Sequence, residues 1–215
     1  MKCDKKNMLL YAVTDRAWTG RQSLPEQVEA ALKGGVTCVQ LREKSLDADA
    51  FLAEAMEIRA LCRSYGVPFI VNDNVDVALR CGADGVHVGQ KDMRAAQVRQ
   101  RVGSGMIIGV SAHSVEEAMA AVRDGADYLG VGAAFATATK TDTHVLSRAV
   151  LEDICRGVDI PVVAIGGIGK ANLMELAGTG VDGVALVSAI FSAEHITEEC
   201  RELRRLSEKM VSAGR

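Results

Sequence analysis

Polar and charged side chains follow several short apolar runs of the chain, and their types suit phosphate and metal chemistry. The first group is the run Gln40-Leu41-Arg42-Glu43-Lys44. Because side chains alternate along a strand, Gln40 and Arg42 share one face, which we expect to point toward the interior and the mouth of a barrel. Arg42 offers a planar fork for phosphate oxygens, and Lys44 offers a mobile point charge. A solvated run of surface charges is the alternative interpretation.

Two aspartates follow neighbouring predicted strands. Asn72-Asp73 ends the third predicted strand, and Asp92 follows the fourth. Two carboxylates from adjacent strand ends can share one hard cation, and Mg2+ typically takes one or two carboxylates while substrate phosphate and water fill the other positions. These residues therefore predict a magnesium site that suits a diphosphate ligand. The alternative is that each aspartate only caps a helix, since Asp is a favoured N-cap residue.

Small residues at the ends of the later strands predict a second anion site. A loop of small residues follows the sixth predicted strand and runs to Lys140, and its hydroxyl and backbone N–H groups suit an oxyanion. Barrels commonly hold a phosphate at the ends of their seventh and eighth strands. Tight turns alone are the alternative for the glycines. The candidates are Thr137, Ala138, Thr139, Gly167, Val187 and Ser188.

Short apolar runs and helical patterns alternate along the whole chain, and a Gly followed by Val or Ala recurs before four of the runs. This alternation predicts one closed, parallel (βα)8 TIM barrel over residues 1–215, with its chemistry at the carboxyl ends of the strands. The predicted strands are Leu9 to Thr14, Thr37 to Leu41, Pro68 to Val71, Gly85 to Val88, Met106 to Val110, Tyr128 to Val131, Val162 to Ile165 and Val184 to Val187. The predicted helices are Leu24 to Lys33, Asp47 to Tyr65, Val75 to Arg80, Met93 to Val102, Val115 to Arg123, Ala149 to Arg156, Lys170 to Ala177 and Glu194 to Val211.

Length and composition narrow the class of protein. The 215 residues fit one barrel domain, and few of the 48% hydrophobic residues are aromatic, as expected of aliphatic parallel strands. A formal net charge of -3 argues against a nucleic-acid surface. Neither a signal peptide nor an apolar membrane span is evident. We expect a cytoplasmic protein with small-molecule substrates and no nucleic-acid or membrane partner, while the oligomeric state stays open.

Histidine and cysteine give no separate catalytic pattern. His87 lies alone in the fourth predicted strand, where an interior hydrogen-bonded role is more common than catalysis. The six cysteines are scattered without a CxxC pair, which favours reduced and mostly buried thiols. No Ser-His-Asp or Cys-His arrangement stands out, and no complete dinucleotide or Walker motif is present.

Six motifs, in this order, resemble the thiamine phosphate synthase family from about Leu10 to Phe191. That resemblance implies a (βα)8 transferase which joins a pyrimidine-methyl diphosphate to a thiazole phosphate and releases pyrophosphate. The motifs that carry the resemblance are Tyr11-Ala12-Val13-Thr14-Asp15, Val39 to Lys44, Asn72-Asp73, Gly82 to Met93, Ile108-Gly109-Val110-Ser111 and Val163 to Ile168.

The resemblance also implies roles for particular residues. Asp73 and Asp92 would bind Mg2+. The pyrimidine diphosphate would be held by Gln40, Leu41, Arg42, Glu43, Lys44, Asn72, Ser111 and Lys140, of which Arg42, Lys44, Ser111 and Lys140 would be catalytic. The thiazole phosphate would be held by Thr137, Ala138, Thr139, Gly167, Val187 and Ser188.

One departure concerns the loop after the sixth strand, where Ala133 and Ala136 replace two prolines usual in the family. Losing a compatible proline typically costs about 0.4 to 1 kcal/mol through greater chain freedom. We therefore predict a loop that is mobile without ligand and closes on the thiazole phosphate. The segment Thr141 to Ser147 also lacks a Pro-Leu-Gly common in the family.

Three other functions stay open from the sequence. A thiazole tautomerase shares the fold but lacks the complete diphosphate and metal set. A non-catalytic barrel could bind thiamine precursors without turnover. A generic phosphate-binding isomerase would need an acid–base pair at the mouth, whereas the acidic residues here suit a metal better.

Overall fold

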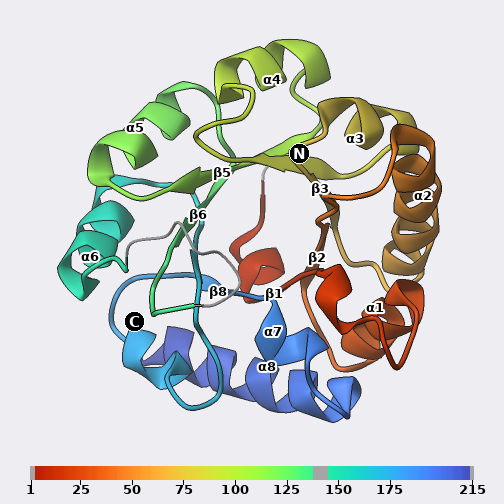
Figure 1. Ribbon diagram of the computed structural model, residues 1–215. Helices are drawn as coiled ribbons and strands as arrows, with labels where there is room; N and C mark the ends of the chain where they lie inside the picture. Colours follow the sequence, from red (N-terminus) through yellow and green to blue (C-terminus); the bar gives the residue numbers. More distant parts are fainter. Residues whose placement is uncertain (1–2, 138–144, 214–215) are drawn as a thin grey trace.

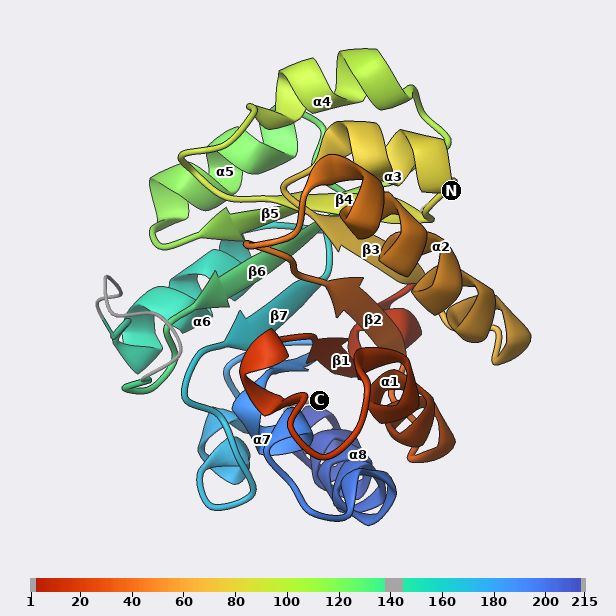
Figure 2. The same cartoon turned by 45° about the vertical axis from the view of Figure 1, so that its right-hand side comes forward.

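The computed structural model describes residues 3–137 and 145–213, and in these ranges eight parallel strands close into a barrel. The strands follow one another in chain order, and β8 pairs with β1 to complete the ring. Helices surround the strands, as Figure 1 shows, and Figure 2 shows the strand arrows pointing to the same end of the barrel. The predicted (βα)8 barrel is confirmed. The strands are β1 (Leu10–Val13), β2 (Cys38–Leu41), β3 (Phe69–Asn72), β4 (Gly85–Val88), β5 (Ile107–Ala112), β6 (Tyr128–Gly132), β7 (Val162–Ile165) and β8 (Gly183–Leu186).

The helices match the predicted ones except near β7 and β8. The predicted α-helix over Lys170 to Ala177 is wrong in type, because only a short 3-10 helix forms there. The Asn172 side chain accepts a hydrogen bond from Gly169 N at 2.8 Å and donates one to Gly167 O at 2.9 Å, and such local bonds compete with α-helix formation. The α-helices are α1 (Leu24–Lys33), α2 (Ala48–Ser64), α3 (Val75–Cys81), α4 (Ala95–Val102), α5 (Val115–Arg123), α6 (Arg148–Gly157), α7 (Ser188–Phe191) and α8 (Ile196–Ser212), and the 3-10 helices are η1 (Lys5–Met8), η2 (Arg16–Trp18) and η3 (Leu173–Leu176).

Strand alternation divides the apolar core into two parts. One side of each strand packs against the helices, where most of the buried aliphatic side chains lie. The other side fills the barrel interior with a smaller cluster that includes Tyr11, Ile70, Tyr128 and Val163. The interior is therefore packed at its base and leaves its polar side chains nearer the mouth.

The recurring Gly-Val and Gly-Ala motifs form a repeated cap at the base of the barrel. The glycine has a positive φ each time, which a residue without a Cβ adopts without strain. The residue two positions later accepts a hydrogen bond from a backbone N–H of the preceding strand, and these bonds measure 2.8 to 3.0 Å. The motif thus satisfies strand donors on alternate strands, β1, β3, β5 and β7. The four acceptors are Thr37 to Leu10 N, Asp84 to Phe69 N, Asp127 to Ile108 N and Asp182 to Val162 N.

The cysteines are all free thiols, and four of them are buried. Burial raises the pKa of Cys62 and Cys200 to about 12, so these thiols stay protonated and unreactive near neutral pH. The expectation of reduced, mostly buried cysteines is confirmed. Separately, every helix of the described ranges is too short or too polar to cross a membrane.

Candidate active site

A cavity of about 650 Å³ opens at the mouth of the barrel, where the strands run into their following helices. Such mouths hold the active sites of (βα)8 enzymes. The cavity brings together residues from the ends of β2, β3, β5, β7 and β8 and from the connections that follow them. The predicted site residues that line it are Gln40, Arg42, Lys44, Asn72, Asp73, Asp92, Ser111, Thr137, Gly167, Val187 and Ser188.

The end of β2 directs alternate side chains to opposite sides. Gln40 and Arg42 line the cavity, as the alternation predicts. Leu41 packs fully buried in the outer core, and the Glu43 side chain is buried against Arg16, so neither side chain lines the cavity. Any contact of Leu41 or Glu43 with a ligand there would have to use backbone atoms, because an extended chain turns every second side chain away.

Arg42 is held in place by the connection that follows β1. Its backbone N–H donates to Thr14 Oγ1 at 3.0 Å, and its Nη1 donates to Asp15 Oδ2 at 3.3 Å. Arg42 lines the cavity, and its side chain is 22% exposed, so it is partly accessible to solvent. The surface-run interpretation therefore does not describe Arg42.

Asp73 and Asp92 both line the cavity, and neither caps a helix. Asn74 caps α3 through its side chain, and α4 begins after Arg94. Asp73 has a left-handed backbone (φ 60°), a conformation that Asp tolerates better than most residues. Its Oδ2 lies 2.5 Å from Lys44 Nζ, and its Oδ1 accepts a hydrogen bond from Asn72. The helix-cap alternative is thus excluded for both carboxylates.

The described residues contain no group of three or more His, Cys, Asp or Glu side chains that could hold a metal alone. Mg2+ does not require such a group, since one or two carboxylates with substrate phosphate and water complete its six positions. Asp73 and Asp92, which share the cavity wall, fit this donor set. Asp92 Oδ2 also accepts a hydrogen bond from Gly89 N at 2.8 Å, which fixes its carboxylate beside the β4 end.

A chain of hydrogen bonds between residues that line the cavity crosses the barrel and links two of the predicted ligand-binding residues. Gln40 Nε2 donates to Tyr11 Oη at 2.8 Å, and Tyr11 Oη lies 2.7 Å from Tyr128 Oη. His87 continues the chain, with Nδ1 at 2.9 Å from Tyr128 Oη and Nε2 at 2.9 Å from Ser111 Oγ. Burial raises the pKa of both phenols well above the ordinary value, so both keep their protons.

The Gln40 amide donates to the Tyr11 hydroxyl, and either hydroxyl can be the donor between Tyr11 and Tyr128. The two ring nitrogens of His87 bind Tyr128 and Ser111, and which nitrogen donates depends on the ring tautomer. The chain therefore links the Gln40 and Ser111 side chains across the barrel. His87 accordingly has the interior hydrogen-bonded position that its strand predicts.

The glycine turn after β7 makes the opposite wall of the cavity. Gly166 and Gly167 both have positive φ, and a Cβ on Gly167 would lie 2.3 Å from Ala136 O. The loop after β6 packs on this turn, since Ala134 N donates to Ile165 O and Phe135 N donates to Gly166 O. Thr137 lines the cavity, whereas the predicted site residues Ala138, Thr139 and Lys140 lie outside the described residues.

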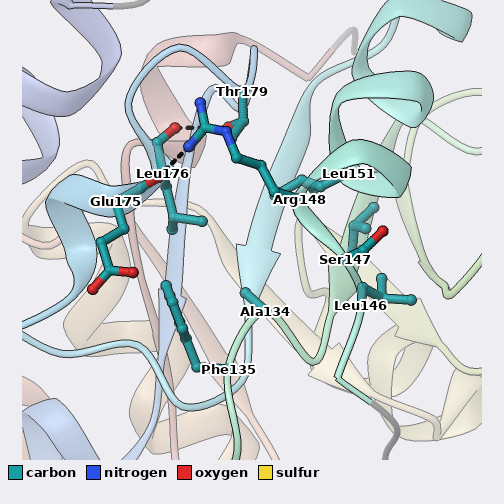
Figure 3. A pocket seen from close by; sticks show the side chains of 10 residues that line it. Ala134, Phe135, Leu146, Ser147, Arg148, Leu151, Glu175, Leu176 and Thr179 are labelled. Atoms are coloured by element: carbon teal, nitrogen blue, oxygen red, sulfur yellow. Dashed lines mark hydrogen bonds between the residues drawn. The ribbon is translucent and has the colours of Figure 1, made fainter.

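A smaller cavity of about 170 Å³ lies outside the barrel, between the start of α6 and η3. Figure 3 shows its largely apolar wall, with Phe135, Leu146 and Leu151, and Arg148 above it. Arg148 donates to Glu175 O and to Ala177 O, which ties α6 to the η3 turn. The polar groups here bind one another rather than converge on the cavity, so the barrel mouth is the better candidate site.

Several residues that line the cavity were not among the sequence candidates. Tyr11 and Tyr128 lie at interior positions of β1 and β6, and a polar aromatic residue in an otherwise aliphatic strand was their signal. Their partners are far apart in the sequence, so spacing gave no indication of contact. The additional lining residues with polar side chains are Tyr11, His87, Gln90, Lys91, His113 and Tyr128.

Fold and site together define a (βα)8 barrel with cations, two carboxylates and a glycine turn around one mouth, a set of groups that suits phosphorylated ligands. The sequence profile of the family described as thiamine monophosphate synthase matches residues 10–190. The chain is 48% identical over 199 residues to a thiamine-phosphate synthase of Ruminiclostridium cellulolyticum, which covers 93% of this chain and 95% of that one. This chain therefore belongs to the thiamine monophosphate synthase family.

Two further relatives agree. A thiamine-phosphate synthase of Chloroflexus aurantiacus is 50% identical over 198 residues, covering 92% of this chain and 91% of that protein. The solved structure of a thiamine phosphate pyrophosphorylase from Pyrococcus furiosus has a TM-score of 0.89 and 40% identity. The match covers 96% of this chain and 98% of that one.

Proposed function

We propose that this protein is a thiamine phosphate synthase. It joins 4-amino-2-methyl-5-(diphosphooxymethyl)pyrimidine to 4-methyl-5-(2-phosphooxyethyl)thiazole and releases pyrophosphate. The observation that carries the proposal is the shared cavity, which is lined by diphosphate candidates and by thiazole phosphate candidates. The former are Gln40, Arg42, Lys44, Asn72 and Ser111, and the latter are Thr137, Gly167, Val187 and Ser188. Family membership over most of the chain supports the same reaction.

The diphosphate is held at the β2 and β3 ends. Arg42 binds phosphate oxygens through its planar guanidinium, and Lys44 adds a mobile charge at the rim, where its side chain is 56% exposed. Asn72 and the Ser111 hydroxyl donate hydrogen bonds to the same substrate. Lys140, outside the described residues, completes the cation set.

The reaction begins when the C–O bond to the diphosphate breaks and the electron pair leaves with the diphosphate. The remaining pyrimidine methylene cation is stabilised by the ring amino group. The thiazole nitrogen then attacks the methylene with its own lone pair, and the new C–N bond gives thiamine phosphate. No proton has to leave this nucleophile, so the reaction needs no general base.

Fixed positive charge is the main contribution of this chain to the first step. Preorganised donors aimed at a departing anion lower the barrier because they need no reorganisation during the reaction. Arg42 meets this condition, since Thr14 and Asp15 hold it before any ligand binds. The second step requires the thiazole nitrogen to lie close to the methylene, and one cavity that holds both rings face to face supplies this proximity.

Asp73 and Asp92 would hold Mg2+ at the same end of the cavity. When bound, the metal would neutralise part of the charge on the diphosphate. Asp73 pairs with Lys44, so this carboxylate already lies beside a cation assigned to the diphosphate.

On the opposite wall, the thiazole phosphate is held by Thr137, Gly167, Val187 and Ser188. The missing Cβ of Gly167 leaves room for the loop that carries Thr137, since a Cβ there would lie 2.3 Å from Ala136 O. Ala138 and Thr139, outside the described residues, belong to the same proposed subsite.

The experiment that tests the proposal gives the purified protein both substrates with Mg2+ and measures thiamine phosphate and pyrophosphate. A synthase forms the two products in equal amounts, and omission of either substrate stops the reaction. Conversion of the thiazole phosphate alone would instead identify a tautomerase. Binding of both compounds without product would identify a non-catalytic binding protein.

A further inference from the structure

Three charged side chains form a cluster on the side of the β2 end that faces away from the cavity. Arg16, in η2 after β1, lies with Nε 2.8 Å from Glu43 Oε1 and with Nη2 2.5 Å from Glu54 Oε1. The Glu43 side chain is 1% exposed and that of Glu54, on α2, is 13% exposed. Arg16 thereby joins the β1 connection, the β2 connection and α2.

The cluster is costly by itself, because two mostly buried carboxylates share one guanidinium, whose side chain is 37% exposed. Both Glu43 oxygens and Glu54 Oε2 are buried without a hydrogen-bond partner among the described residues, and the contact of Arg16 Nε with Glu43 is an ion pair without hydrogen-bond alignment. Burial and the neighbouring Glu43 carboxylate raise the pKa of Glu54. Buried ion pairs contribute little net stability against a well-packed apolar alternative. A role in holding the site explains the cluster better than stability does.

Three consecutive residues after β1 hold the end of β2 on both sides. Thr14 accepts the Arg42 backbone N–H at 3.0 Å, and Asp15 binds the Arg42 side chain at 3.3 Å on the cavity side. Arg16 binds Glu43 on the opposite side. The backbone between Arg42 and Lys44 is thus held on the cavity side and on the opposite side, in an orientation in which both cations line the cavity.

Arg16 also matters for the charge that surrounds Arg42 and Lys44. Glu43 stands between Arg42 and Lys44 in the chain, so its carboxylate would compete with a bound anion for these cations. Arg16 neutralises it and holds it away from the cavity. Without Arg16 the Glu43 charge would be buried and uncompensated, a state that the chain can relieve by turning Glu43 toward its cationic neighbours.

We propose that Arg16 is a positioning residue for the diphosphate substrate, and that it acts by holding Glu43 and Glu54 behind the strand end that carries Arg42 and Lys44. The inference rests on the proposed function, because it takes the diphosphate as the anion that Arg42 and Lys44 bind. It assigns Glu43 to the support of the site rather than to contact with substrate.

The test compares Arg16→Met with Arg16→Lys, with the double variant Arg16→Met/Glu43→Gln, and with Arg21→Met as a control on the same exposed connection. For Arg16→Met, the KM for the pyrimidine diphosphate and the dissociation constant of pyrophosphate with Mg2+ should rise between about 10-fold and 100-fold, the effect expected of a misplaced binding group. The KM for the thiazole phosphate should stay within about twofold of the wild-type value, which is less than about 0.5 kcal/mol of binding free energy. Arg16→Lys should recover part of the loss, since it restores the charge.

The double variant separates charge from packing. It removes the uncompensated Glu43 charge, so it should bind pyrophosphate more tightly than Arg16→Met although it has lost both partners. If Arg16→Met does not fold, the double variant still allows pyrophosphate binding to be measured without Arg16. Equal weakening for both substrates, or lowered thermal stability with unchanged pyrophosphate binding, would overturn the proposal in favour of a purely structural role.

Direct binding of pyrophosphate distinguishes this proposal from the proposed function. A wild-type protein that binds pyrophosphate but makes no thiamine phosphate would overturn the function alone, and the ratio of Arg16→Met to wild-type affinity would still decide the role of Arg16. A wild-type protein that binds no pyrophosphate would overturn both.

Discussion

The repeated cap at the base of the barrel makes a quantitative prediction for Asp84→Ala. Asp84 Oδ2 accepts the Phe69 N–H at 2.9 Å, and Phe69 is fully buried at the start of β3. Removing the carboxylate leaves this donor without its acceptor, which costs about 1.5 to 3 kcal/mol for a bond to an ionised group. For a chain of this size, each kcal/mol shifts the melting temperature by about 2 to 4 °C. We therefore expect Asp84→Ala to melt about 3 to 12 °C below the wild type.

Asp84→Asn is the matched comparison, because the amide keeps one oxygen to accept the Phe69 N–H but loses the charge. It should lose about half as much free energy of unfolding, since neutral hydrogen bonds are roughly half as strong as charged ones. Asp159→Ala, at an exposed position, controls for the loss of a surface carboxylate. The assay is thermal and urea unfolding followed by circular dichroism.

Asp182→Ala should be additive with Asp84→Ala. Asp182 caps β7 at Val162 N, and β3 and β7 lie on opposite sides of the closed strand order. Distant sites without shared partners usually add within about 0.5 kcal/mol. A loss below 0.5 kcal/mol for Asp84→Ala, or equal losses for the Ala and Asn variants, would refute the assignment of these residues as strand caps.

Three further predictions concern the interior and the charge cluster. Tyr128→Phe should lower the free energy of unfolding by about 1 to 3 kcal/mol in urea titrations, because Tyr11 Oη and His87 Nδ1 lose their shared partner; an unchanged midpoint would show that the chain of hydrogen bonds is not maintained. Gly109→Ala should cost about 1 to 3 kcal/mol, since its Cβ would lie 2.1 Å from the Tyr128 ring, and a near-neutral result in the same assay would show that the ring can move aside. The pKa of Glu54 is raised above 4.5 in the folded protein, so this carboxyl ionises in the unfolded chain at a lower pH than in the folded one. Its contribution to the free energy of unfolding is therefore complete below pH 4.5 and is lost as pH rises through the folded pKa. Glu54→Gln should therefore flatten the fall of stability with pH in this window, and parallel curves for variant and wild type would contradict the raised pKa.

The strands and the mouth of the barrel could be predicted because their causes are local. Each apolar run carries its own strand propensity, and the capping motif recurs just before β2, β4, β6 and β8. Alternation alone directed Gln40 and Arg42 toward the cavity and Leu41 away from it. The residues of neighbouring strand ends then had to meet, because all eight strands are parallel.

The support of the site could not be predicted because its partners are distant in sequence. Arg16 after β1 meets Glu43 after β2 and Glu54 on α2, and nothing in the β1 connection indicates these ion pairs. Glu43 illustrates the limit most clearly, since the family resemblance implied a ligand contact for it while its side chain faces away from the cavity. The short α7 helix was also missed, because four residues carry no helical period.

Metal dependence of thiamine phosphate formation tests the central claim most directly. The measurement is the rate of product formation from both substrates across a Mg2+ titration, for the wild type, Asp73→Asn and Asp92→Asn, with a parallel chelator-treated sample. Product should form only with Mg2+, and each variant should have a rate lowered by at least about 100-fold, the usual scale for losing a group that stabilises developing charge. Full activity in chelator, or either variant turning over at the wild-type rate without metal, would contradict the assignment of these carboxylates.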